Sequence, residues 1–284
     1  MSHRLPLPYN TILTDNKNIK IENLIGRGST CLVYEALYID HFNYQHKLRV
    51  KEFYPKQTNI TRVNQLLQYE NETEFHQLYK QFLKGYENNI LLQNELGLNN
   101  DTTTAFDIIQ ANNTYYLLIS YDDGISYDKY QEPSFASLIK HLINLCSIIS
   151  KIHHQNYLHL DIKSDNLLLL KDQDTFKLLD FDTITSIEHS DKPSTYNLYS
   201  APEQKAFSNC TNFTSDIFSI GAIFFEKLYG RIPNILDYQM NTSYNDKFLL
   251  DDTMLSYHSK MMIHDILRHT LNISQDKRYP TIDH

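Results

Sequence analysis

Residues 159–166 read His-Leu-Asp-Ile-Lys-Ser-Asp-Asn and are followed by the apolar run Leu167–Leu170, which predicts a strand. The run places three polar side chains close together, those of Asp161, Lys163 and Asn166. Asp161 could accept a proton from a hydroxyl group, and Lys163 could neutralise charge on a transferred phosphoryl group. The amide oxygen of Asn166 is a suitable ligand for a divalent metal. The octapeptide therefore indicates phosphoryl transfer assisted by a metal.

A second candidate metal ligand follows the next predicted strand. The run Leu178-Leu179-Asp180-Phe181-Asp182 puts the carboxylate of Asp180 at a strand end. Carboxylate and amide oxygens together suit Mg²⁺. We therefore expect Asp180 and Asn166 to share one Mg²⁺ site, although either motif alone could be an ordinary polar loop.

Upstream of this region, three features fit phosphate binding. Gly26 and Gly28 lie in a turn between two predicted strands, where glycines let backbone N–H groups approach phosphate oxygens closely. A plain hairpin turn explains the glycines equally well. Lys51 lies on the next predicted strand and Glu87 on a predicted helix at 70–96, so an ion pair could hold the lysine against phosphates. Two solvent-exposed charges are the simpler alternative.

The spacing of apolar residues divides the chain into a strand-rich first half and a helical second half. The clearest predicted strands are at 19–22, 31–38, 47–53, 106–110 and 115–119, and the predicted helices at 70–96, 135–154, 215–229 and 254–271. We expect an α+β fold with two lobes in a single domain, 1–284. The strand-rich N-lobe would span about 15–119, the hinge 120–124 and the helical C-lobe 125–284.

Composition excludes several classes of protein. The 284 residues carry 26 Lys and Arg against 34 Asp and Glu, a net charge of -8, which argues against nucleic acid or an anionic membrane as partner. The cysteines Cys31, Cys146 and Cys210 are scattered and form no CxxC pair, which fits reduced thiols. No secretory signal and no run of about 18 apolar residues is present. We expect a cytoplasmic protein without a membrane segment, acting in its own cell or, as a secreted effector, in a host; the oligomeric state is left open.

The order of these motifs, continued by Ala201-Pro202-Glu203, by the run 215–221 and by Arg278, resembles the eukaryotic-like (Hanks-type) serine/threonine protein kinase family. The resemblance runs from about residue 19 to the C-terminus and favours a bacterial member. It implies a two-lobed kinase fold that uses ATP with Mg²⁺, or Mn²⁺, and phosphorylates Ser or Thr hydroxyls of protein substrates. Lys163 fits the serine/threonine pattern better than the tyrosine pattern.

The resemblance also assigns roles to individual residues. The catalytic residues would be Asp161 (the base), Lys163, Lys51 and Glu87, and the metal ligands Asn166 and Asp180. The ATP-binding residues would be Ile25, Gly26, Gly28, Val33, Lys51, Ile119, Tyr121 and Leu168. Two roles are structural: Glu203 would pair with Arg278, and Asp216 would brace the backbone of the catalytic loop.

The sequence departs from the family pattern at four positions. Cys31 replaces the third loop glycine, Arg49 replaces a small residue two before Lys51, and Asp182 replaces the glycine of DFG. Arg49 must be turned aside or stacked to leave room for adenine. Leu160 replaces the arginine that binds an activation-loop phosphate.

Because Leu160 lacks a charge, we expect activity without loop phosphorylation at the candidate acceptors Ser194, Thr195 and Tyr196. Two alternatives stay open: a catalytically weak kinase-fold scaffold, and a small-molecule kinase of the aminoglycoside or choline type. The family continues into one more helix after Arg278-Tyr279-Pro280, so the final helix is expected to be truncated or the chain to be part of a longer protein.

Overall fold

The computed structural model describes residues 4–14, 18–56, 59–189, 196–205, 211–239 and 255–283. The chain divides into two compact units. Unit 1 comprises Met1–Glu95 and Thr103–Asp122, and unit 2 comprises Leu96–Thr102 and Asp123–His284. The division after Asp122 lies inside the segment expected to be the hinge.

The segment Leu96–Thr102 belongs to unit 2, although it lies within the range expected for the N-lobe. The reason is backbone pairing: the N–H of Leu178 donates to the carbonyl of Asp101 at 2.9 Å, and Thr102 forms a parallel bridge with Leu178. A short piece of the first half of the sequence is thereby attached to the second unit.

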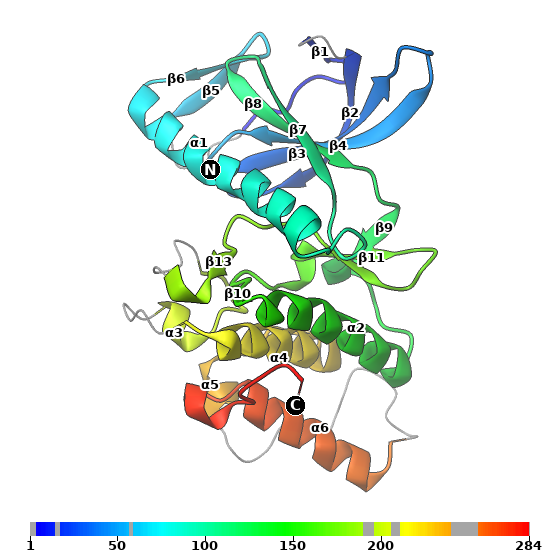
Figure 1. The fold of residues 1–284 in the computed structure, drawn as a ribbon, viewed down its shortest axis with the longest axis vertical. Helices are drawn as coiled ribbons and strands as arrows, with labels where there is room; N and C mark the ends of the chain where they lie inside the picture. The colour runs from blue at the N-terminus through cyan, green and yellow to red at the C-terminus, as the bar shows by residue number, and fades with distance from the viewer. Residues whose placement is uncertain are drawn as a thin grey trace. The chain divides into compact units, whose positions relative to one another are not determined.

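Unit 1 is built on an antiparallel six-stranded sheet, drawn from blue to green in Figure 1. The strand order is β1-β2-β3-β4-β8-β7, with bounds β1 Ile12–Thr14, β2 Asn18–Arg27, β3 Cys31–Ile39, β4 Gln45–Phe53, β7 Ala105–Ala111 and β8 Thr114–Ser120. Burial alternates along β3 and β4, as expected of strands with one face on a core. A separate hairpin of β5 (Ile60–Val63) and β6 (Leu66–Tyr69), which the sequence analysis did not predict, completes the strands of this unit.

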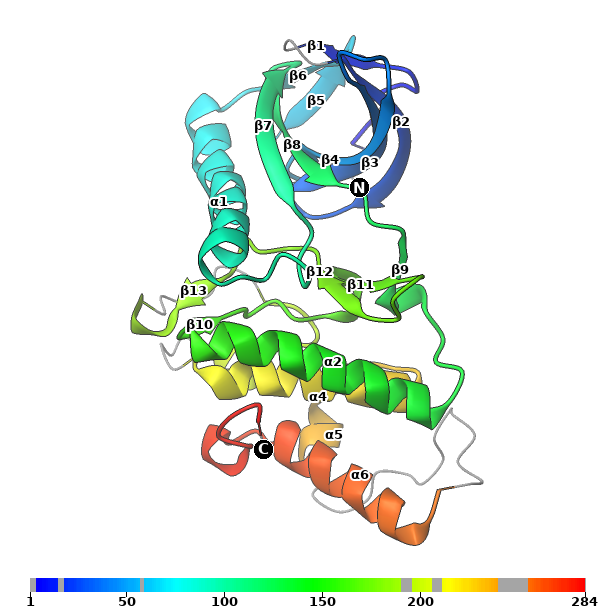
Figure 2. The ribbon, with the colours of Figure 1, turned by 45° about the vertical axis from the view of Figure 1, so that its right-hand side comes forward.

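Helix α1 (Glu72–Ile90) packs beside this sheet (Figure 2) and continues into a π-helical turn at Leu91–Glu95. Its N-terminus is capped by Asn71, whose side chain accepts a hydrogen bond from the N–H of Glu74 at 3.1 Å. Phe75 and Phe82 bring their rings to 5.0 and 5.3 Å from that of Phe53 on β4. Aromatic packing of this kind fixes the helix against the sheet.

Unit 2 is mostly helical, and Figure 2 shows α2 and α4 side by side in it. Its helices are α2 Phe135–His154, α3 Pro202–Lys205, α4 Phe213–Tyr229, α5 Ile235–Gln239 and α6 Tyr257–Thr270, with 3-10 turns at Tyr127–Lys129, Ser164–Asn166, Ile187–His189 and Gln275–Lys277. Its strands are β9 Gly124–Ser126, β10 Tyr157–Leu158, β11 Leu167–Leu170, β12 Phe176–Leu178 and β13 Thr185–Ser186. The long helices and the main strands agree with the sequence prediction, within a few residues at their ends.

The core of unit 2 lies along α2 and α4. Ser134 caps α2, and a capping box of Asn212 and Ser215 starts α4, which ends at Gly230 with a positive φ of 68°. Gly124 in β9 allows a close approach, because a Cβ there would meet the carbonyl of Leu169 at 2.6 Å. These elements hold the loop 159–166 and the strand end at Asp180 in place.

Helix α2 is also long and apolar enough, over Phe135–His153, to cross a membrane. This is weak evidence for a span, because the core helix of a globular unit passes the same test. Leu138, Leu145 and Ile152 on this helix are fully buried within the protein.

Candidate active site

The catalytic loop of unit 2 brings Asp161, Lys163 and Asn166 together as predicted. Oδ2 of Asp161 lies 3.1 Å from Nζ of Lys163 and accepts a hydrogen bond from Nδ2 of Asn166 at 2.8 Å. Nδ2 of Asn166 also donates to the carbonyl of Asp161 at 3.0 Å. The two donors fix the carboxylate plane, while 16% of the Asp161 side chain stays exposed to solvent. A carboxylate held in this way can receive a proton from a positioned hydroxyl group.

The charge of Lys163 is retained in this setting. Burial disfavours the ammonium, but the carboxylates of Asp161 and Asp165 outweigh burial, and the pKa of Lys163 is raised. Lys163 is therefore a permanent positive charge beside the candidate base.

The backbone of the loop is braced by Asp216 on α4, which is fully buried. Its two carboxylate oxygens accept hydrogen bonds from the N–H groups of His159 and Leu160, both at 2.8 Å. Oδ2 also lies 2.9 Å from Nε2 of His153. Burial raises the pKa of Asp216, but these hydrogen bonds and the nearby His charges overcome it, so the pKa is lowered. Leu160 has a positive φ of 63°, a strained conformation that this brace maintains.

The predicted metal ligands are neighbours through the backbone. The N–H of Leu179 donates to the carbonyl of Asn166 at 3.0 Å, which places Asp180 beside Asn166. The amide nitrogen of Asn166 is used on Asp161, and its buried amide oxygen accepts no hydrogen bond from the residues that the structure describes. An amide oxygen and a carboxylate side by side fit a hard cation such as Mg²⁺.

Two amide side chains that the sequence analysis missed attach the activation segment to this loop. Nδ2 of Asn197 donates to Oδ1 of Asp161 at 2.6 Å, and Nε2 of Gln204 donates to the carbonyl of Leu160 at 2.9 Å. Asn197 is itself fixed, because its side-chain oxygen accepts from the N–H of Tyr199 at 2.6 Å. No spacing rule singles out these amides in the sequence; only the folded loop brings them to Asp161 and Leu160.

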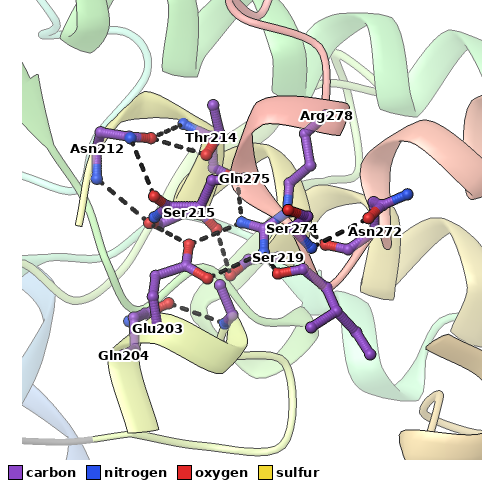
Figure 3. Close-up of polar contacts among 12 residues, drawn as sticks. Glu203, Gln204, Asn212, Thr214, Ser215, Ser219, Asn272, Ser274, Gln275 and Arg278 are labelled. Carbon is purple, nitrogen blue, oxygen red and sulfur yellow. Dashed lines mark hydrogen bonds and ion pairs between the residues drawn. The ribbon is translucent and has the colours of Figure 1, made fainter. Parts of the chain in front are cut away.

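The predicted pair of Glu203 and Arg278 is present and buried, as the close-up in Figure 3 shows. The guanidinium contacts both carboxylate oxygens, at 2.7 and 2.9 Å. Ser215 donates to the same carboxylate at 2.7 Å. Burial raises the pKa of Glu203, but the bonds and charge of Arg278 outweigh burial and lower it. The end of the activation segment is thus attached to the helical core of unit 2.

In unit 1 the sheet brings three predicted phosphate- and adenine-binding residues into one row. Gly26 on β2 pairs with Val33 on β3, and Val33 pairs with Lys51 on β4. A Cβ at Gly26 would meet that of Val33 at 3.3 Å, so this position favours glycine. The remaining predicted ATP-binding residues differ in exposure: Ile25 is exposed, Tyr121 and Gly28 are accessible, and Ile119 and Leu168 are buried, the last in unit 2.

The structure does not form the predicted ion pair between Lys51 and Glu87. The side chain of Glu87 is exposed on α1, and among the described residues no ion pair joins it to Lys51. The physical reason is the rotation of the helix, which Asn89 sets: its side chain donates to the carbonyl of Thr103 and accepts from the N–H of Ala105, both at 2.7 Å. Residues two apart lie about 200° apart around a helix, so Glu87 faces away from the side that Asn89 buries.

Two of the departures from the family pattern are resolved locally. Arg49 is turned aside, as expected: its guanidinium lies over the Tyr121 ring at 5.6 Å from the centroid, and Nη2 donates to the carbonyl of Asp122 at 2.8 Å. The thiol of Cys31 is buried in the core of unit 1. Leu160 is also buried, and cannot replace an arginine as a phosphate ligand.

Comparison with known proteins now identifies the class. The protein kinase domain family model matches residues 19–282, and the chain therefore belongs to this family. The structure is similar to a solved structure of the apo form of PpkA-294, with a TM-score of 0.69, 22% identity and coverage of 98% of this chain and 97% of that one. This likeness confirms the predicted two-lobed kinase fold class.

Sequence relatives include bacterial and eukaryotic kinases. The chain is 28% identical over 139 residues to the serine/threonine-protein kinase PrkC of Bacillus subtilis, and 29% over 136 residues to the probable serine/threonine-protein kinase PknB of Lactococcus lactis. These matches cover 46% and 45% of this chain but only 21% of each relative. Identity to the serine/threonine-protein kinase PLK4 of Drosophila virilis is 24%, over 96% of this chain and 34% of that one.

Proposed function

We propose that this chain transfers the γ-phosphoryl group of ATP to serine or threonine hydroxyls of protein substrates, with Asp161 as the general base. The observation that carries the proposal is the fixed carboxylate of Asp161, held by Lys163 at 3.1 Å and by Asn166 at 2.8 Å. The substrate hydroxyl oxygen forms a bond to the γ-phosphorus while the bond to the bridging oxygen of ADP breaks. Asp161 receives the hydroxyl proton, and Lys163 offsets charge on the transferred group.

Asn166 and Asp180 would hold the metal ion, Mg²⁺ or Mn²⁺, through their oxygen atoms. When bound, the ion neutralises charge on the phosphate oxygens. Lys51 would contact the phosphates, and the turn at Gly26 and Gly28 would present backbone N–H groups to them. For adenine we propose the apolar residues Ile25, Val33, Ile119, Tyr121 and Leu168. The Lys51–Glu87 pair stays a prediction, and a variant Glu87→Gln that keeps full activity would remove Glu87 from the mechanism.

We further propose that the activity does not require phosphorylation of the activation segment. Leu160 offers no charge to a phosphate, and uncharged amides of Asn197 and Gln204 already link the segment to the catalytic loop. Ser194 and Thr195 lie outside the described residues. Because the matches cover only a fifth of the bacterial relatives, the substrates and the cytoplasmic location of the whole protein are also proposals.

The test is transfer of labelled phosphate from Mg²⁺-ATP to a generic basic protein and to the chain itself. Asp161→Asn should lower the rate by about 1,000-fold or more, because the base and its charge are both lost. Asp180→Ala should do the same by removing a metal ligand. Asp172→Asn is the matched control, because this carboxylate lies exposed in the turn between β11 and β12.

Phosphoserine or phosphothreonine that appears with wild type and Asp172→Asn, and disappears with the other two variants, would support the proposal. A folded wild type that binds ATP but transfers phosphate to no protein would contradict it. Transfer to a small hydroxyl metabolite would then indicate the small-molecule kinase, and no transfer the scaffold.

A further inference from the structure

Arg4 lies against the turn of residues 28–31, and it precedes the segment 19–282 that the family model matches. Only 5% of Arg4 is exposed. Its Nη2 donates to the carbonyl of Gly28 at 2.6 Å, and its Nη1 donates to the carbonyl of Tyr54 and, at 3.5 Å, to that of Cys31. We call residues 28–31 the glycine-rich turn.

The partners of Arg4 are unusual for a buried charge. Among the described residues, no carboxylate pairs with Arg4, and its hydrogen-bond acceptors are all neutral backbone carbonyls. Burial lowers the pKa of Arg4, which shows that the charge is held at a cost. Buried guanidinium groups are normally paired, so an unpaired one at a turn suggests a role beyond packing.

The other carbonyls of the turn are also held from the protein side. The carbonyl of Ser29 accepts from the N–H of Lys56 at 3.0 Å, and that of Thr30 accepts from the N–H of Tyr54 at 2.9 Å. In a planar trans peptide the C=O and the following N–H point in opposite directions. The N–H of Ser29 therefore points away from Arg4, and the N–H of Thr30 points away from Lys56.

These two N–H groups have no acceptor among the residues that the structure describes. Ser29 is exposed and Thr30 is partly exposed. Adjacent N–H groups of a turn that point the same way form a concave site for an anion such as a phosphate. The orientation of the first donor depends on the contact between Arg4 and Gly28.

The segment that carries Arg4 is itself firmly attached to unit 1. The N–H of Leu7 donates to the hydroxyl of Tyr34 at 3.0 Å, and Nε of Arg62 donates to the carbonyl of Leu5 at 2.8 Å. The carbonyl of Arg4 accepts from Nη1 of Arg27 at 2.8 Å. Arg4 thus has a fixed base from which to hold the turn.

We propose that Arg4 is a positioning residue for nucleotide phosphates, which acts by holding the carbonyl of Gly28 so that the N–H of Ser29 is presented to a phosphate oxygen. The role rests on the proposed function, in which the chain binds ATP. Arg4 does not contact the nucleotide itself, and it sets the affinity for phosphates and not that for adenine.

The test compares binding of a non-hydrolysable ATP analogue with Mg²⁺ and binding of adenosine, which lacks phosphates. Arg4→Met should weaken the ATP analogue about 10-fold, the loss expected for one misplaced donor to a charged oxygen. Adenosine affinity should change less than about twofold, because adenine contacts remain. Arg4→Lys keeps the charge and can reach one carbonyl, and should recover part of the ATP affinity.

Arg62→Lys is the matched control, because Arg62 holds the neighbouring Leu5 but makes no hydrogen bond to the turn. It should lower the melting temperature without changing the ratio of ATP to adenosine affinity. Equal weakening of both ligands in Arg4→Met, or a lower melting temperature with an unchanged ratio, would overturn the role of Arg4. If Arg4→Met does not fold, the same ratio measured on Arg4→Lys decides. A wild type that binds adenosine but gains nothing from the phosphates would overturn the proposed function itself.

Discussion

Two turns of this protein are each fixed by one buried side chain, but the charges are opposite. In unit 1, the Arg4 cation holds carbonyl groups of residues 28–31. In unit 2, the Asp216 anion holds the N–H groups of His159 and Leu160. A cation on the carbonyls leaves N–H groups available for phosphate, whereas an anion on the N–H groups fixes the loop that carries the base.

The two contacts should therefore differ in what they contribute. Buried N–H groups that lose their acceptor are costly, whereas carbonyls with one empty lone pair are more common in proteins. Asp216 also pairs with His153 at 2.9 Å, so its loss leaves three donors without a partner. We expect Asp216 to dominate stability and Arg4 to dominate phosphate affinity.

The largest expected effect is that of Asp216→Asn. The amide keeps one acceptor oxygen but sets an NH₂ group against a backbone N–H, so we expect a loss of about 3 kcal/mol in the free energy of unfolding. Phosphoryl transfer should fall below detection because the catalytic loop loses its brace. Urea denaturation and the labelled-phosphate assay measure the two effects.

The control for this variant is Asp265→Asn, which removes an exposed ion pair with Arg268 on α6. Such pairs contribute about 0.5 kcal/mol or less. Equal losses from Asp216→Asn and Arg4→Met would break the comparison, because the two anchors would then be the same kind of structural contact.

A smaller effect is expected at Asn197, which contacts Oδ1 of Asp161 at 2.6 Å. Asn197→Ala should lower kcat about 10-fold, the value of one hydrogen bond to a charged group, with little change in the KM for ATP. Loss of a donor favours the protonated carboxyl group, so the acid limb of the kcat profile should move to higher pH. Steady-state kinetics across pH measure both changes.

Asn272→Ala is the matched control. The side chain of Asn272 accepts from the N–H of Ser274 at 3.0 Å, a turn like that of Asn197 and Tyr199, but it lies far in sequence from the catalytic loop. An Asn197→Ala enzyme with the kinetics of Asn272→Ala would show that Asn197 only shapes its turn. Asn197→Ser, which keeps a donor, should restore part of kcat.

The comparison also explains what the sequence could predict. Asp216, Glu203 and Arg278 were predicted because each belongs to a motif with fixed spacing, and all three make the expected contacts. The long helices and the main strands were predicted because their apolar residues repeat at helical or strand spacing. Arg4 could not be predicted, because its partners are backbone carbonyls, which every residue has.

The same reason applies to the other omissions. Asn197 and Gln204 bind a carboxylate and a carbonyl that lie tens of residues away, and Asn89 determines where Glu87 points through a strand that follows later in the chain. The hairpin at 60–69 is short and has an exposed face. Contacts between distant segments decide these features, and a local pattern does not encode them.

A buried charge that depends on pH sharpens the comparison between the two permanent ones. His141 is fully buried, with Nδ1 at 2.7 Å from Glu132 and Nε2 at 2.9 Å from Asp174. Burial lowers the pKa of His141, but the two carboxylates overcome it and the pKa is raised above its ordinary value of 6.5. Tyr127 donates to Glu132, and Lys140 pairs with Asp174, so these groups face the site as well.

Because the folded pKa of His141 lies above the unfolded one, its contribution to stability is complete below about pH 6.5 and is lost as pH rises through the raised value. The free energy of unfolding of the wild type should therefore decline over this window, whereas that of His141→Asn should not. Urea denaturation between pH 5 and 9 measures it, within the native range of the wild type. Parallel curves for the two proteins would show that His141 is neutral throughout.

The smallest expected effect is that of removing the hydroxyl groups of the activation segment. Uncharged amides already connect this segment to the catalytic loop, and the buried Leu160 has no charge for a phosphate. A variant with Ser194→Ala, Thr195→Ala and Tyr196→Phe should therefore keep kcat within about twofold of wild type, since such a change is under 0.5 kcal/mol in barrier height. Wild type treated with a phosphatase should behave in the same way. A loss of 10-fold or more in both samples would mean that a phosphate is a necessary third anchor, held by a cation other than residue 160.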